Sequence, residues 1–153
     1  MEAYVTEFNK WMAAPEVSDE VKSELVALTE DEKKTLSVLA FLFFRMGMED
    51  RARRFYETIA ELSTPGTPDF RFAKAGLAAA AIEAGDAETA LKEVREALAG
   101  GPLSSRDATL HWLKSRALWA LGRKVEARAA RETFLSMRGA PARAEDEDAV
   151  TLQ

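Results

Sequence analysis

The 153-residue sequence contains no cysteine and a single histidine, His111. Without cysteine the chain can form no disulfide, no thiolate metal site and no cysteine nucleophile. His111 has no second histidine or acidic residue three or four positions further on, which is the spacing that would let a helix share a metal ion. We therefore interpret His111 as a structural residue, and we expect a protein that is not an enzyme and has no cofactor or metal site.

The sequence also lacks a surplus of positive charge and a long apolar run. It has 21 Lys and Arg against 26 Asp and Glu, a formal net charge of -5, whereas nucleic-acid-binding proteins usually carry a basic excess. The longest apolar run, Leu36 to Phe44, is far shorter than the roughly 20 residues that span a bilayer, and we interpret it as a buried helix. The start of the chain lacks the pattern of a secretory signal. We expect a cytoplasmic protein with no nucleic acid and no stable membrane insertion.

What the sequence has in abundance is alanine, leucine, glutamate and arginine, with few β-branched residues. This composition favours helix, so the fold class is predicted to be all-α. Thr29 and Glu32 form a capping-box pattern that places a helix start near residue 30. Segments rich in glycine and proline, which end helices, divide the chain at 63–68, 100–102 and 139–141.

A pattern of one glycine followed by alanine five residues later occurs three times. The pairs are Gly47 with Ala52, Gly85 with Ala90 and Gly122 with Ala127. Apolar residues at helical spacing precede each glycine and a second helical stretch follows it, which predicts a helix, a tight turn and a second helix in each block. Three matching offsets favour a true repeat over an irregular helical bundle with coincidental glycines.

These blocks resemble the tetratricopeptide repeat (TPR) family, whose unit has about 34 residues. The units would be 33–66, 71–104 and 108–141, so the resemblance implies an α-solenoid of three degenerate helix pairs within residues 31–139. The sequence departs from the family pattern because its glycines are 38 and 37 residues apart, because Lys114 and Ser115 stand where a large and a small residue are expected, and because Arg131 replaces an aromatic residue.

The two flanks differ from the repeats. Residues 1–30 carry apolar side chains at helical spacing and are expected to form a helical extension that caps the solenoid. These side chains are Tyr4, Phe8, Trp11 or Met12, then Val21, Leu25 and Leu28. Residues 140–153 contain four consecutive acids and little to bury, so we expect a disordered acidic tail.

In a TPR-like solenoid the first helix of each pair lines a concave groove. Side chains on these helices that the core does not need would then contact a protein partner. The candidates are Phe41, Phe44 and Arg45 in the first unit, Phe72, Ala79 and Ile82 in the second, and Trp112, Arg116 and Trp119 in the third. The alternative is that the N-terminal helices of the chain itself cover these aromatic side chains.

A narrower resemblance is carried by the third block, residues 100–137. Its "PL" break, tryptophan-leucine, "SRA", glycine turn and "EAR" occur in the order found in small export chaperones of bacterial type III secretion, of the SctY (YscY) type. That resemblance implies a cytoplasmic chaperone that holds a small secreted or apparatus protein, an SctX-like client, until export.

Two other hypotheses remain open. The same apolar groove would also suit a structural assembly module that self-associates as a homodimer. Arginine clusters at 51–54 and 123–131 would suit nucleic-acid binding, although acidic neighbours favour a solvated, salt-bridged surface.

Overall fold

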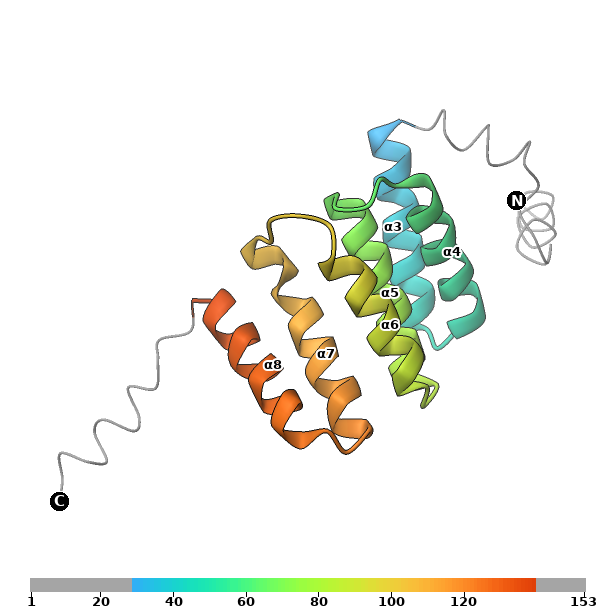
Figure 1. Cartoon of the computed structure of the whole chain (residues 1–153). Coiled ribbons are helices and arrows are strands. Elements are labelled where there is room, and N and C mark those ends of the chain that lie inside the picture. Colours follow the sequence, from blue (N-terminus) through green and yellow to red (C-terminus); the bar gives the residue numbers. More distant parts are fainter. Residues whose placement is uncertain (1–28, 140–153) are drawn as a thin grey trace, which may run out of the picture.

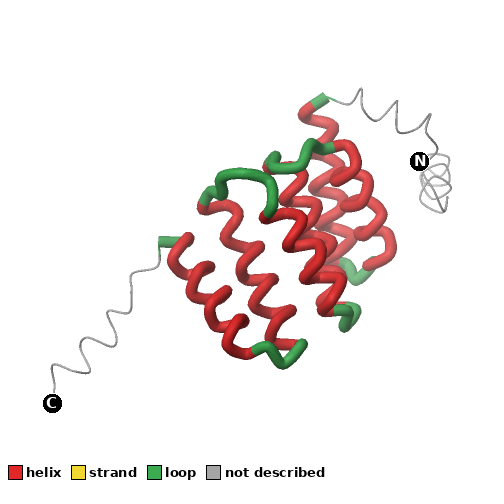
Figure 2. The backbone as a smooth tube through the Cα atoms, viewed as in Figure 1, coloured by secondary structure: helices red, strands yellow, loops and turns green. Residues whose placement is uncertain are grey.

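The computed structural model describes residues 29–139, and these fold into α-helices joined by short loops (Figure 1). No strand occurs in this range (Figure 2), so the all-α prediction is confirmed for it. The expected extension up to residue 28 and the tail 140–153 lie outside the described residues. The helices are α3 (Glu30–Arg45), α4 (Glu49–Leu62), α5 (Pro68–Glu83), α6 (Ala87–Leu98), α7 (Ala108–Ala120) and α8 (Lys124–Met137), with a 3-10 turn at Ser105–Asp107 before α7.

The six helices form three antiparallel pairs, α3 with α4, α5 with α6 and α7 with α8 (Figure 1). Each helix packs mainly against the helices that precede and follow it in the chain. We call α3, α5 and α7 the first helices, and α4, α6 and α8 the second helices. In addition α5 contacts both α3 and α7, so the first helices lie next to one another.

The three glycines of the repeated pattern each end a first helix. Gly47, Gly85 and Gly122 have φ of 73°, 79° and 76°, the left-handed conformation that only glycine adopts without strain. The N–H of each glycine donates to the carbonyl three residues before it, at 3.0–3.1 Å. The following N–H donates to the carbonyl five residues before it, at 2.8–2.9 Å. These two bonds define the Schellman motif, and the predicted tight turns are confirmed.

The alanines that follow these glycines bring the two helices of a pair close together. Ala52, Ala90 and Ala127 expose 0%, 0% and 1% of their surface, as the predicted small-residue contact requires. In the third pair the hydroxyl of Ser115 on α7 donates to the carbonyl of Ala127 on α8 at 2.8 Å. The helix start predicted near residue 30 is also confirmed, because Thr29 and Glu32 make both bonds of the capping box.

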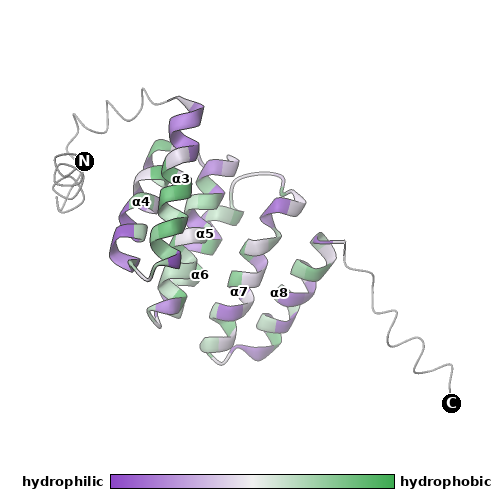
Figure 3. Ribbon diagram, turned by 180° about the vertical axis from the view of Figure 1, so that it is seen from behind, coloured by the Kyte–Doolittle hydropathy of each residue, from purple (hydrophilic) through white to green (hydrophobic). Residues whose placement is uncertain are grey.

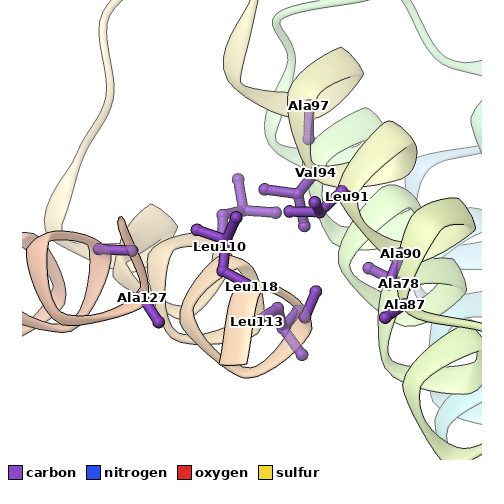
Figure 4. Packing of buried hydrophobic residues seen from close by; sticks show 12 residues of the cluster. Ala78, Ala87, Ala90, Leu91, Val94, Ala97, Leu110, Leu113, Leu118 and Ala127 are labelled. Carbon is purple, nitrogen blue, oxygen red and sulfur yellow. The ribbon is translucent and has the colours of Figure 1, made fainter. Parts of the chain in front are cut away.

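The buried side chains form two adjoining clusters. One joins α3, α4 and α5 around Phe55 and Tyr56. The other joins α5, α6, α7 and α8, and Figure 4 shows Leu91 and Val94 of α6 beside Leu110 of α7. Helix α5 contributes to both clusters, with Leu77 in the first and Ala78 in the second.

The loops between the pairs meet each other and are fastened by a buried arginine. A side chain at Gly100 would lie 2.6 Å from the Cα of Gly66, so only glycine fits where the two loops touch. Arg71, near the start of α5, donates to the carbonyls of Gly100 and Gly101 at 2.9 and 3.3 Å and to Asp107 at 3.1 Å. Arg71 thus ties α5 to the loop before α7, while the contact of Gly66 with Gly100 joins the two loops directly.

Candidate partner-binding surface

Large apolar side chains that remain exposed are concentrated on the first helices. Those on the first helices, or on the residue that caps α3, are Val38, Phe41, Leu42, Met46, Phe72, Trp112 and Trp119. The others in the described range are Leu103 in a loop and Val125 and Leu135 on α8, and none lies on α4 or α6. Four of these exposed side chains, Phe41, Phe72, Trp112 and Trp119, are at positions that the sequence analysis named as candidates.

The apolar run Leu36–Phe44 is exposed along one side of α3, so its interpretation as a buried helix is wrong. Only Ala40 in α3 is buried, whereas Phe41 exposes 50% and Leu42 47% of its surface. The physical reason is that α3 is the first described helix of the row, so α4 and α5 cover one side of it alone. Figure 3 shows the middle of α3 in green, the colour of hydrophobic residues.

The structure brings several predicted residues into matching positions on neighbouring first helices. Phe44, Ile82 and Trp119 each lie three residues before a turn glycine, and their carbonyls accept the glycine N–H bonds. Their exposure differs because Phe44 and Ile82 are half-buried against the two core clusters, while Trp119 exposes 56% of its surface. Phe41 and Arg116 match in the same way, six residues before Gly47 and Gly122.

The two tryptophans of α7 are held from one side by α8 and stay open on the other. The ring of Trp112 lies 5.5 Å from the ring of Phe134, measured between centroids. The ammonium of Lys124 lies 5.6 Å from the centroid of Trp119, in a cation–π arrangement. Each indole therefore has a contact with α8 that favours one orientation of the ring.

Phe72 lies apart from the other candidates, near the start of α5. Its ring packs edge-on against Tyr56 of α4, with centroids 5.8 Å apart, and 40% of its surface is exposed. Burial raises the pKa of Tyr56 to about 12, so the phenol stays neutral at physiological pH. Phe72 thus extends the apolar surface toward the opposite end of α5 from Ile82.

The two predicted cations, Arg45 and Arg116, are exposed at the surface. Arg116 on α7 pairs with Glu83 on α5 at 3.5 Å, and about half of each side chain is exposed. Ion pairs exposed to this extent contribute about 0–1 kcal/mol, so exchange of Glu83 for a partner carboxylate costs little. Arg45 is exposed in the last turn of α3, where a cation complements the helix dipole.

A shallow acidic cleft, which sequence reasoning missed, lies among α4, α5 and α6. Its volume is about 300 Å³, and none of the predicted binding residues lines it. The acids around it are Glu49, Asp50, Glu57, Asp86 and Glu93. Burial raises the pKa of Glu57, an effect that Arg53 opposes and Glu61 and Glu93 reinforce. The acids come from α4 and from α6 with its N-cap, and no local sequence motif indicates that they lie close together.

Within residues 29–139 no three side chains of His, Cys, Asp or Glu are placed to hold a metal ion. His111 is half-buried, and this burial, with Lys114 nearby, lowers its pKa. None of the helices in this range is both long and apolar enough to cross a membrane.

Comparison with models of known protein families and with curated proteins finds no match. The surface described above combines exposed aromatic side chains, equivalent positions on neighbouring first helices and two exposed arginines.

Proposed function

We propose that this protein is a TPR-like, non-enzymatic chaperone or adaptor that holds a segment of one protein partner on its first helices. Residues 100–137 resemble small export chaperones of the SctY type, so we favour a cytoplasmic chaperone of type III secretion as its role in the cell. Its client would then be a small secreted or apparatus protein, SctX-like in that case.

The observation that carries this proposal is the uneven distribution of exposed apolar side chains. Phe41, Phe72, Trp112 and Trp119 expose 40–56% of their surface, and all four lie on first helices. Covering one large apolar side chain contributes roughly 1.5–3 kcal/mol before ordering costs. Four such side chains are enough for a peptide or helix to bind specifically.

The charged side chains beside this surface would select the partner. Arg45 and Arg116 are exposed on α3 and α7, and charge-assisted hydrogen bonds from arginine favour carboxylates. An apolar segment flanked by acidic residues therefore suits the surface best. The acids of the cleft are on α4 and on α6 with its N-cap, and none of the proposed binding residues lines that cleft.

Coexpression with each small reading frame that neighbours the gene tests the proposal. The expected result is one neighbour that copurifies and elutes with this protein as a single complex in size-exclusion chromatography. If no neighbour forms a complex, the chaperone proposal fails.

Sedimentation equilibrium of the purified protein alone distinguishes the self-associating assembly module. A monomer without client supports the proposed function. A stable homodimer that buries the tryptophans of α7 would instead favour the assembly module.

A further inference from the structure

One side of α3 ends the row of helices and carries exposed apolar side chains. Thr35, Val38 and Leu42 are spaced i, i+3 and i+7, so they form one stripe, which we call the α3 end face. Val38 exposes 57% and Leu42 47% of its surface, and Met46 continues the stripe. This face is distinct from the predicted binding residues Phe41 and Arg45.

The corresponding positions on the other first helices are covered. Counted back from the turn glycines, the equivalents are Ala73, Gly76 and Ala80 on α5 and Leu110, Leu113 and Ala117 on α7. Five of these six residues are buried, and the sixth, Gly76, is half-buried.

In both cases the cover is the second helix of the preceding pair. A Cβ at Gly76 would overlap the ring of Tyr56 from α4. Leu110 and Leu113 belong to the same buried cluster as Leu91 and Val94 of α6. The α3 end face therefore has the form of a docking site for a helix that precedes α3.

The chain itself supplies a suitable segment directly before α3. Val21, Leu25 and Leu28 are spaced i, i+4 and i+7, so they share one face if this segment is helical. A helix over residues 18–28 would be about 16 Å long, at roughly 1.5 Å per residue. The stripe from Thr35 to Met46 has about the same length.

We infer that residues 1–28 cover the α3 end face, with Val21, Leu25 and Leu28 against Val38 and Leu42. The segment then takes the place that α4 has on α5 and that α6 has on α7. It completes the scaffold and leaves Phe41 and Trp119 open to a partner. The inference depends on the geometry of α3 and holds whether or not the proposed client exists.

Thiol reactivity of the full-length chain tests this inference in the absence of any partner. The natural sequence has no cysteine, so one introduced cysteine is the only thiol. Leu42→Cys would report on the α3 end face, and Val125→Cys, at a position on α8 that is 81% exposed, is the matched control. We expect Leu42→Cys to react with an aromatic disulfide reagent about ten-fold more slowly than the control, because a covered thiol reacts only when its cover opens.

Adding Leu25→Asp to each variant identifies the cover. This change is expected to restore the reaction rate of Leu42→Cys to within about two-fold of the control, since a buried carboxylate disfavours docking, and to leave Val125→Cys unchanged. Equal rates for Leu42→Cys and Val125→Cys in the unmodified background would overturn the inference. Slow reaction of Leu42→Cys that persists in the presence of Leu25→Asp would also overturn the inference. So would slow reaction that disappears on dilution, because dilution removes a cover supplied by a second copy of the chain. Should circular dichroism show that Leu42→Cys does not fold, Val38→Cys provides the same comparison.

Discussion

Replacement of Arg71 by methionine removes the guanidinium that joins α5 to the connection between α6 and α7. Arg71 is buried, with 7% of its side chain exposed, and so is its partner Asp107 at 9%. Removing one member of a buried ion pair costs about 3–5 kcal/mol, because the other charge is left without compensation. Asp107 keeps bonds from the N–H and hydroxyl of Ser104, at 2.7 and 3.2 Å, so we expect the lower end, about 3 kcal/mol.

Urea unfolding followed by circular dichroism measures this loss. With a slope of about 1.5 kcal/mol per molar urea, the midpoint should fall by about 2 M. Arg123→Met is the matched control, since Arg123 pairs with Glu126 at 2.6 Å but both side chains are about half exposed, and it should lower the midpoint much less. Combining Arg71→Met with Asp107→Asn should recover part of the loss, because the uncompensated charge is gone. Equal effects of Arg71→Met and Arg123→Met would refute the reasoning.

Three further predictions concern the core. Gly76→Ala should destabilise the protein by about 1–3 kcal/mol in urea unfolding despite the better helix propensity of alanine, because the methyl group overlaps the Tyr56 ring; unchanged stability would mean that α4 and α5 are less closely packed. Burial raises the pKa of Tyr56 to about 12 in the folded protein, from 10.0. The contribution of Tyr56 to the free energy of unfolding should therefore be complete below pH 10 and should be lost between pH 10 and 12, by on the order of 2 kcal/mol. Tyr56→Phe should abolish this pH dependence, and an equal alkaline loss of stability in this variant would contradict the assignment. Phe44→Ala should lower the free energy of unfolding by about 2 kcal/mol, since the ring is half-buried against the core; a change limited to partner binding would show that the ring is not part of the core.

Local features of the fold were predictable because they depend on neighbours in the sequence. The capping box at Thr29 needs only Glu32, and the turn at Gly85 needs only a glycine after an apolar helical stripe. The closely packed alanines followed from their constant distance to the turn glycines. The assignment of residues to first and second helices followed from the same pattern.

Long-range features were not predictable from one sequence. The contact between Gly66 and Gly100 and the pairing of Arg71 with Asp107 join segments that are far apart in the chain, and neither has a local signal. The burial predicted for the apolar run in α3 was also wrong. Hydrophobicity indicates that a helix packs against other elements, but it does not indicate which of its faces they contact. The candidate site was therefore predicted as a set of positions, while the division into half-buried Phe44 and exposed Trp119 required the structure.

The central claim is that exposed side chains on the first helices bind a protein partner. Isothermal titration of the copurifying client against Trp119→Ala and Val125→Ala tests it most directly, since both positions are exposed but only Trp119 lies on a first helix. Trp119→Ala is expected to weaken binding about ten-fold or more, a loss of about 1.4 kcal/mol or more, without lowering the melting temperature, and Val125→Ala is expected to bind normally. Unchanged affinity of Trp119→Ala, or an equal loss in both variants, would contradict it.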